Sequence, residues 1–191
     1  MIPRLVVASK NPDKVTEIEA LLDGTGLANE IVRGLYWPDV EETGATLEEN
    51  ARLKMRAVVD ATGLPVLADD TGLEVRALGG EPGVNSARFA GPTAAYSDNV
   101  ALMLERMRGW SDRDARFRTV VALGFPDGVE ILAEGILEGR ICHEPRGAGG
   151  FGYDPIFEVE GKTLAEMTPD EKNSLSHRAR AVAALVEALG L

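Results

Sequence analysis

The sequence has 191 residues, 45% of them hydrophobic and 5% aromatic, which is enough apolar material for one domain with a sizeable core. Its 31 acidic and 20 basic residues give a formal net charge of −11, which argues against nonspecific binding to nucleic acid or to an acidic membrane surface. Cys142 is the only cysteine, so a disulfide framework is excluded and a reducing compartment fits. No apolar run approaches the length of a membrane-spanning helix. We therefore expect a cytoplasmic protein that folds as a single domain over residues 1–191, with no membrane or nucleic-acid partner.

The first predicted element is a buried strand over residues 5–8, followed by a polar turn and a helix whose apolar face carries Val15, Ile18 and Leu22. Asn11 is expected to cap this helix, with Pro12 at its first position. Free N–H groups at the helix start, together with Lys10 and Lys14, favour anion binding. The turn lacks the glycines of a Walker loop, so a merely capped helix is the alternative.

A second strand is predicted at residues 31–32, followed by a loop over residues 40–45. Thr46 and Glu49 form a capping box that begins a helix with an apolar stripe. Lys54 lies along the edge of that stripe, where a lysine is most often a surface residue. The alternative is that Lys54 reaches over a phosphate site, with Glu41 or Glu42 meeting Asp70 at a metal.

Residues 66–73 form the stretch around which the chain is organised. A short apolar run predicts a buried strand that ends in Asp69 and Asp70, followed by a Thr-Gly turn. Buried carboxylates need a compensating cation or donors, and ligands gather at the carboxyl ends of strands in α/β sheets. This end of the strand is a candidate metal or general-base site; otherwise Asp69 caps the turn and Asp70 is solvated.

The middle of the chain contains a long polar loop, a helix and a hairpin. The loop spans residues 79–91, a length typical of functional or mobile loops. A helix is predicted over residues 96–108, and strands over 117–125 and 129–141 flank a Pro-Asp-Gly turn. His143 follows as a predicted surface residue.

A glycine-rich segment over residues 147–155 contains a formal G-x-G-x-x-G, but Asp154-Pro155 follows at once and no helix begins there. The dinucleotide-binding fingerprint requires that helix, so we reject it. Phe151 between glycines is either a platform for stacking a base or a plug of the core.

The last predicted element is one helix from residue 169 to about 189, which begins with the capping box of Thr168 and Glu171 and ends at Gly190. Lys172, His177 and Arg178 lie on its first half. A His-Arg pair on a helix is usually part of the solvated surface.

Together these motifs closely resemble those of the inosine triphosphate pyrophosphatase family, which hydrolyses non-canonical purine nucleoside triphosphates. The resemblance covers essentially the whole chain and rests on several segments in order: Ser9-Lys10-Asn11 with Lys14, Glu41 to Gly44 with Glu49 to Ala51 and Lys54, Ala68 to Leu73, Pro82 to Val84 with Ser86 to Arg88, Phe151 to Pro155, and Ser176 to Arg178.

The resemblance implies a three-layer α/β fold on a long mixed central sheet, with two lobes around a substrate cleft and a homodimeric assembly. It implies a Mg²⁺-dependent enzyme that cleaves ITP, dITP and XTP to the monophosphate and pyrophosphate. Asp70 matches the general base and a metal ligand, and Glu41 matches the other metal ligand. The residues that match substrate contacts are Ser9, Lys10, Asn11, Pro12, Asp13, Lys14, Lys54 and Thr71 for the first loop and the triphosphate, and Phe151, Gly152, Tyr153, Asp154, Lys172, His177 and Arg178 for the base pocket. Lys10 and Thr71 depart from the family, which often has a small or neutral residue and a serine there.

The residues themselves support such chemistry. Release of pyrophosphate needs a cation on the phosphates, a carboxylate to activate water, and ammonium groups for the charge on the leaving group. Lys172, His177 and Arg178 offer hydrogen-bond donors, which suit the 6-oxo group of inosine and xanthosine rather than the 6-amino group of adenosine.

Two other classes of protein share parts of this pattern. A phosphatase that forms an aspartyl-phosphate needs a second Asp two residues after its nucleophile, and Thr71 and Gly72 occupy those positions. A sensor that binds a purine nucleotide without turnover would not need the carboxylates of Glu41 and Asp70.

Overall fold

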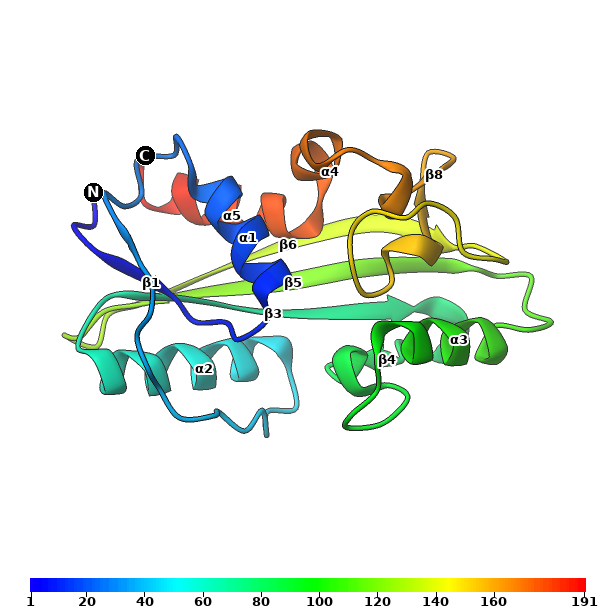
Figure 1. The fold of residues 1–191 in the computed structure, drawn as a ribbon, viewed down its shortest axis with the longest axis horizontal. Helices are drawn as coiled ribbons and strands as arrows, with labels where there is room; N and C mark the ends of the chain where they lie inside the picture. The colour runs from blue at the N-terminus through cyan, green and yellow to red at the C-terminus, as the bar shows by residue number, and fades with distance from the viewer. The chain divides into compact units, whose positions relative to one another are not determined.

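Eight strands of the computed structural model, which describes all 191 residues, form one mixed sheet flanked by helices (Figure 1). The strand order is β2-β1-β3-β5-β6-β7-β8, with β4 paired to β3. This confirms the predicted α/β class. The elements are β1 (Leu5–Val7), α1 (Pro12–Leu22), β2 (Ile31–Val32), α2 (Leu47–Thr62), β3 (Val66–Val75), β4 (Pro82–Gly83), α3 (Tyr96–Arg106), β5 (Asp114–Gly124), β6 (Glu130–Ile141), β7 (Phe157–Val159), β8 (Lys162–Thr163), α4 (Pro169–Leu175) and α5 (His177–Ala188).

The chain divides into two compact units built from interleaved segments. Unit 1 comprises residues 1–70, 119–135 and 177–191, and unit 2 comprises residues 71–118 and 136–176. Strands β3, β5 and β6 contribute residues to both units. None of the helices combines the length and the apolar character needed to cross a bilayer.

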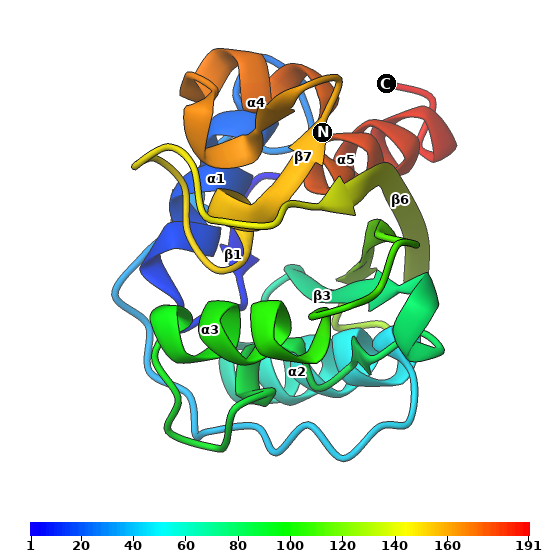
Figure 2. The same cartoon turned by 90° about the vertical axis from the view of Figure 1, so that its right-hand side faces the viewer.

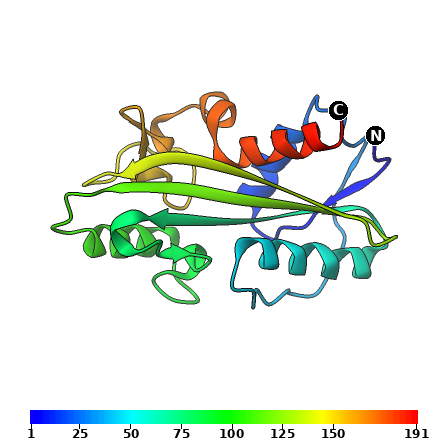
Figure 3. The same cartoon turned by 180° about the vertical axis from the view of Figure 1, so that it is seen from behind.

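In unit 1, helices α1 and α5 lie side by side on one face of the strands and α2 covers the other face, as Figures 1 and 3 both show. Strand β1 pairs in parallel with β2 and β3, with Val6 opposite Val66 and Val7 opposite Leu67. An apolar core forms between the strands and helices α1 and α5. The buried members of this core are Ile2, Leu5, Val7, Ile18, Leu22, Leu27, Leu67, Val121, Leu123, Ala181, Val182 and Leu185.

The helices of unit 1 begin where the sequence predicts. The side chain of Asn11 accepts a hydrogen bond from Asp13 N at 3.0 Å, and Thr46 accepts one from Glu49 N at 3.2 Å. Each bond satisfies one of the N–H groups that the first turn leaves without a partner. Gly63 ends α2 in the left-handed conformation, with φ of 65°.

The predicted Thr-Gly turn after Asp70 is wrong, because β3 continues through it to Val75. Leu73 and Val75 are fully buried in the core of unit 2, which favours an extended chain here. Gly72 lies so close to β4 that a Cβ atom would stand 2.8 Å from the Gly83 carbonyl oxygen. Glycine at position 72 therefore permits close strand pairing and does not mark a turn.

In unit 2, α3 covers one face of the strands, and α4 lies on the other (Figure 2). The predicted helix and hairpin strands are confirmed within a few residues. No helix follows the G-x-G-x-x-G, because residues 154–156 form a single 3₁₀ turn. Another apolar core fills this unit, with Leu73, Val75, Val100, Met103, Met107, Ala115, Phe117, Leu137, Ile141, Tyr153, Ile156, Phe157 and Leu164 as its buried members.

The prediction of one helix over residues 169–189 is also wrong. The capping box of Thr168 and Glu171 forms as expected, but α4 ends at Leu175. Ser176 is extended, with ψ of 155°, and α5 begins at His177. The break lies where the chain passes from unit 2 to unit 1, so the two halves of the predicted helix belong to different units. Apolar periodicity continues across the break, which is why the sequence pattern does not reveal it.

Gly135 in β6 allows the first turn of α5 to lie directly on the strand. A Cβ atom at this position would stand 2.1 Å from the His177 carbonyl oxygen and 2.3 Å from Ala181 N. Both atoms belong to the backbone and cannot move aside without shifting the helix. We therefore expect Gly135→Ala to lower the free energy of unfolding by at least about 2 kcal/mol, as overpacking does. Urea denaturation measures this change.

The matched control is Glu138→Ala, which introduces alanine at an exposed position of the same strand. It should change stability by no more than about 0.5 kcal/mol. Equal effects of the two substitutions would show that the close approach at Gly135 carries no special cost.

Candidate functional site

Asp69 in β3 lies at the centre of a buried group of charged side chains in unit 1. Its exposed fraction is 1%, and its Oδ2 atom lies 3.2 Å from Lys14 Nζ and 3.2 Å from Arg178 Nη2. Strand β1 ends at Val7, which is paired with Leu67, so the turn that leads to Lys14 lies beside the carboxylates of β3. The expectation that Asp69 and Asp70 lie at the carboxyl end of their own strand is wrong, because β3 continues to Val75; they lie instead beside the carboxyl end of β1.

Arg178 is held by two carboxylates. Its Nε and Nη2 atoms donate to Asp69 Oδ2 at 3.3 and 3.2 Å, and its Nη1 atom donates to Glu17 Oε2 on α1. The usual alternative for such a pair, a place on the solvated surface, does not apply to His177 and Arg178, because their exposed fractions are 4% and 1%. Arg178 therefore connects α5 to both α1 and β3.

The charges in this group shift one another's pKa values. Burial alone would raise the pKa of Asp69, but Lys14, Arg178 and Lys54 outweigh it and hold that pKa well below its usual range. Burial lowers the pKa of Lys14, and neighbouring Asp69 only partly opposes this. Burial also disfavours the charged form of Arg178, but Asp69 and Glu17 overcome it and raise the pKa. Asp69 is therefore an anion paired with two cations, one of which also binds Glu17.

Asp70, the next residue, has a different environment. Lys54 Nζ donates to Asp70 Oδ1 at 2.9 Å and lies 2.8 Å from Glu42 Oε1. Asp70 Oδ2 is buried and receives no hydrogen bond from the protein. Burial raises the pKa of Asp70 above its usual range, although Lys54 and Lys14 oppose the shift. Burial disfavours the charged form of Lys54, but the carboxylates of Asp70, Asp69 and Glu42 overcome this effect and raise its pKa.

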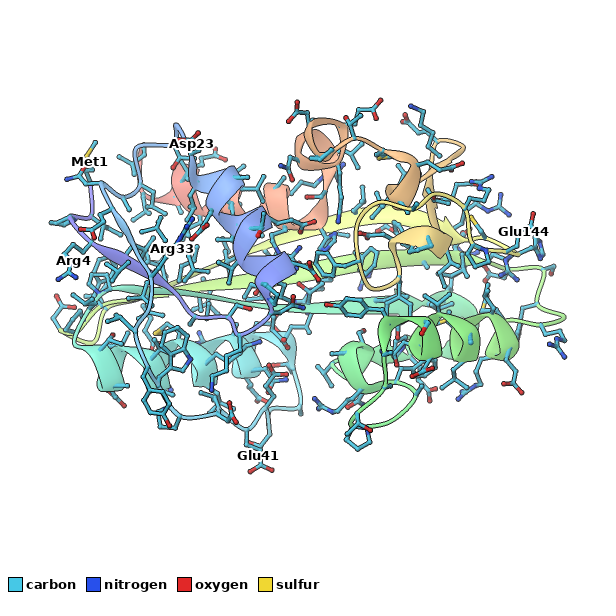
Figure 4. All side chains as sticks on the ribbon, in the orientation of Figure 1. Met1, Arg4, Asp23, Arg33, Glu41 and Glu144 are labelled. Atoms are coloured by element: carbon cyan, nitrogen blue, oxygen red, sulfur yellow. The ribbon has the colours of Figure 1, made fainter.

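Of the two adjacent glutamates, Glu42 lies at this group and Glu41 does not. Glu41 is exposed, and its carboxylate points away from the ribbon (Figure 4). A hydrogen bond from Thr43 N to the Glu41 carbonyl oxygen turns the chain tightly at Glu42, and of the pair only Glu42 is in contact with Lys54. We name the seven residues of unit 1 described so far the acid–base cluster: Lys14, Glu17, Glu42, Lys54, Asp69, Asp70 and Arg178.

The first predicted substrate loop contributes one side chain to the acid–base cluster. Lys14 reaches Asp69, whereas Lys10 is exposed and forms an ion pair with Asp39. Ser9 Oγ accepts a hydrogen bond from Asn11 N at 3.2 Å, which shapes the turn. Pro12 and Asp13 form the first turn of α1.

Phe151 is the centre of a separate group in unit 2. Its backbone N donates to Asp154 Oδ2 at 2.8 Å, and Lys172 Nζ donates to the same oxygen at 2.6 Å. Lys172 Nζ also lies 4.8 Å from the centre of the Phe151 ring, a cation–π contact. Asp154 and Lys172 are buried, whereas Phe151 is half-buried and lies outside the apolar core. The phenylalanine is not a plug of the core.

Glycines on both sides of Phe151 allow this arrangement. Gly150 and Gly152 have φ values of 68° and 62°, which other residues rarely adopt. At Gly150 a Cβ atom would stand 2.1 Å from Asp154 Oδ2. The two glycines thus present the ring while the backbone is tied to a buried carboxylate.

Tyr153 joins the same loop to the segment after β4 through a hydrogen bond. Its hydroxyl donates to the Ser86 carbonyl oxygen at 2.9 Å. Ser86 Oγ accepts from Leu73 N at 2.8 Å, which ties the loop after β4 to β3. Burial raises the pKa of Tyr153, so its hydroxyl remains a donor at neutral pH. Thr71, the first residue of unit 2, is half-buried in β3.

Lys172 and Arg178, which the resemblance assigns to one base pocket, have different partners in the structure. Lys172 binds Asp154 in unit 2, and Arg178 binds Asp69 and Glu17 in unit 1. His177 also belongs to unit 1. Among the three donors, only Lys172 shares a unit with Phe151.

Sequence reasoning missed Glu17 and Tyr96. Glu17 follows Lys14 by three residues on α1 and therefore lies on the same face, so helical spacing could have indicated it. Tyr96 has its ring centre 5.9 Å from that of Phe151, but the two residues lie far apart in the chain and no local pattern joins them.

A family model and several curated proteins match nearly the whole chain. Residues 5–188 match the model of the Ham1 family. Proteins named dITP/XTP pyrophosphatase from Streptomyces coelicolor and Symbiobacterium thermophilum are 47% and 52% identical to this chain. The first alignment covers 96% of this chain and 95% of the relative, and the second covers 97% and 94%.

Solved structures of Ham1 proteins are similar to this chain over nearly its whole length. The Ham1 protein of Staphylococcus aureus has a TM-score of 0.85 at 37% identity, with 98% of each chain covered. A HAM1 protein from Coxiella burnetii has a TM-score of 0.86 at 41% identity, with 99% of each chain covered.

The partners of Arg178 predict its contribution to stability. Arg178→Ala would remove one of the two cations that contact Asp69 and the guanidinium that binds Glu17. Loss of one partner from a buried ion pair typically costs about 3–5 kcal/mol, and we expect a loss of unfolding free energy of that size. Arg180→Ala, at an exposed position of the same helix, is the control and should cost less than about 1 kcal/mol. Equal losses in urea denaturation would contradict the buried-pair account.

The raised pKa of Tyr153 predicts a pH dependence of stability. Up to about pH 10 both folded and unfolded chains keep the phenolic proton, so its stabilising effect is complete. Above that pH the unfolded chain releases the proton and the folded chain does not. Stability should then fall with rising pH, by up to about 1.4 kcal/mol per pH unit.

The measurement is urea denaturation of the wild type and Tyr153→Phe from pH 7 to pH 11. The wild type should be more stable by about 1 kcal/mol at pH 7, the value of one hydrogen bond. This advantage should shrink above about pH 10. A constant difference across the range would mean that Tyr153 ionises equally in both states.

Proposed function

The chain belongs to the Ham1 family, and we propose that it hydrolyses non-canonical purine nucleoside triphosphates, with dITP, XTP and ITP as substrates. The products are the nucleoside monophosphate and pyrophosphate. The enzyme is a hydrolase of acid anhydrides that removes such nucleotides from the pool. The acid–base cluster of unit 1 is the observation that carries this proposal.

Asp70 is the proposed general base. Its buried Oδ2 atom receives no hydrogen bond from the protein, so it can accept one from a water molecule. Burial raises its pKa, which strengthens it as a base. Water activated by Asp70 attacks the α-phosphorus, and pyrophosphate leaves. The ammonium groups of Lys14 and Lys54 are proposed to stabilise the charge on the phosphates.

The donor set near Asp70 fits a hard divalent cation such as Mg²⁺. Within the acid–base cluster, the carboxylates of Asp70 and Glu42 are 2.9 and 2.8 Å from Lys54 Nζ. No group of three metal-binding side chains is present, and Mg²⁺ typically takes one or two carboxylates and completes its coordination with substrate phosphates and water. The cation supplies electrostatic stabilisation of the phosphate charge. We propose Asp70 as one ligand, with Glu42 better placed than the expected Glu41.

Phe151 and its neighbours in unit 2 are proposed to bind the purine base. The half-buried ring offers a stacking surface, and Lys172 offers only donors. Donors match the 6-oxo group of hypoxanthine and xanthine and leave the 6-amino group of adenine without a partner. Tyr153, Asp154 and Gly152 shape the loop. His177 and Arg178 remain proposed substrate contacts, with Arg178 held in unit 1 by its two carboxylates.

Other expectations rest on the family resemblance alone. We propose contacts to substrate from the turn over residues 9–13 and from Thr71, a homodimeric assembly, and a cytoplasmic location. The exposed Lys10, paired with Asp39, is better placed for solvent than for phosphate in the structure described.

The proposal predicts defined products. With Mg²⁺, dITP should yield dIMP and pyrophosphate in equal amounts without dIDP, because attack occurs at the α-phosphorus. In ¹⁸O-labelled water the label should appear in dIMP. Orthophosphate and dIDP as first products would contradict this mechanism, and tight binding of dITP without any turnover would favour a nucleotide sensor.

Asp70→Asn tests the role of Asp70, because it keeps the shape of the side chain and removes the base. We expect turnover to fall at least about 100-fold while the protein remains folded. A variant that keeps more than about a tenth of the wild-type kcat would exclude Asp70 as the base.

A further inference from the structure

Tyr96, the first residue of α3, forms an aromatic pair with Phe151 at the surface of unit 2. The ring centres are 5.9 Å apart, and the ring planes are inclined by 39°. Tyr96 is 42% exposed, and Phe151 is half-buried. Neither ring belongs to the apolar core of this unit. Packing of the core therefore does not explain why two aromatic rings meet here.

The two members of this pair differ in their exposure to solvent. The backbone of Phe151 is tied to Asp154, and its ring lies 4.8 Å from the buried ammonium of Lys172. Tyr96 is the first residue of α3 and is more exposed than Phe151. The phenylalanine thus forms the inner side of the pair, and the tyrosine forms its solvent-exposed side.

We propose that Tyr96 is a second aromatic contact for the base of the bound nucleotide, with the base held between the rings of Phe151 and Tyr96. This inference rests on the proposed function, because it takes Phe151 as the platform for the base. It adds a residue from α3, far from the glycine-rich loop in the sequence, to the residues that determine affinity for the substrate.

The geometry sets a condition on this arrangement. Aromatic faces that hold a planar base between them stand about 7 Å apart, since each stacking contact takes roughly 3.5 Å. The rings are closer than that in the structure, so they must move apart to admit a base. The direct contact of the two rings covers apolar surface that the base would cover once bound.

Stacking on an aromatic ring depends little on which base is present, because every base has a π face. Loss of the Tyr96 ring should therefore weaken all purine nucleotides by a similar factor. It should leave the preference for 6-oxo bases unchanged, because that preference comes from hydrogen-bond donors such as Lys172. The contribution of Tyr96 is to affinity and not to the choice among purines.

Steady-state kinetics with dITP test the proposal. Tyr96→Ala should raise KM about 10-fold, the size of one stacking contact, with kcat changed less than about 2-fold. Tyr96→Phe keeps the ring and should behave as the wild type. Tyr36→Ala removes a tyrosine that is 86% exposed in unit 1 and should have no effect. Inhibition by inorganic tripolyphosphate, which has no base, should be equal in the wild type and Tyr96→Ala.

A double-mutant cycle with Phe151→Ala separates direct contact from support of the phenylalanine. If Tyr96 contacts the base itself, Tyr96→Ala should still raise KM at least about 3-fold in the Phe151→Ala background. No effect in that background would mean that Tyr96 acts only through Phe151 and would overturn the proposal. Equal KM values for the wild type and Tyr96→Ala would overturn it as well.

These outcomes are distinct from failure of the proposed function. A wild type that releases no pyrophosphate from dITP contradicts the function, and calorimetric binding of dITP to the wild type and Tyr96→Ala then tests the aromatic contact alone. An active wild type with an unaffected Tyr96→Ala leaves the function standing and removes the inference.

Discussion

The buried carboxylate of Asp69 is the interaction on which the rest of unit 1 depends. Removing a carboxylate from water costs several kcal/mol unless cations and donors replace the solvent. Lys14 comes from α1 and Arg178 from α5, so neutralising this one group joins both helices to β3. Glu17 completes the set by binding Arg178 from α1. Because α5 approaches the strand closely at Gly135, the backbone of Arg178 lies near the sheet.

The balance of charge in the acid–base cluster explains why a divalent cation suits it. With all seven groups ionised, four carboxylates face three cations, which leaves one net negative charge. A triphosphate that approached this cluster alone would meet that charge in a protein whose formal net charge is already −11. A divalent cation reverses the sign of the cluster. Neighbouring aspartates consequently differ in role: Asp69 holds cations in place, whereas Asp70 keeps one buried oxygen available.

In unit 2, a buried carboxylate holds a loop in place rather than joining helices to a strand. The polar groups around Phe151 satisfy one another, since Asp154 accepts from both the Phe151 backbone and Lys172. A buried carboxylate thus fixes a loop that glycines make possible. The aromatic ring, held in place by this polar support, is left half-buried for contact with a ligand.

Several local features could be predicted from the sequence because they depend on neighbouring residues. Asn11, Thr46 and Thr168 cap helices as expected, because a cap needs only a short side chain and an N–H group two or three residues away. The buried strand that carries Asp69 and Asp70 was also recognisable. The family resemblance placed the chemistry on these carboxylates, on the lysines and on Phe151, and the α/β class is confirmed.

Other features were decided only by the tertiary structure. Strand β3 continues through Gly72, where a neighbouring strand lies too close for any side chain, and α4 ends at Leu175, just before the chain passes from one unit to the other. No local sequence pattern indicates the strand beside Gly72 or the boundary between the units at residue 176. Glu42 rather than Glu41 faces Lys54, and Arg178 binds Asp69 and Glu17 rather than remaining in solvent. The sequence by itself determined which ionisable and aromatic residues are present and which local elements carry them. Only the tertiary structure decided which of them meet, because burial and pairing depend on residues that are distant in the chain.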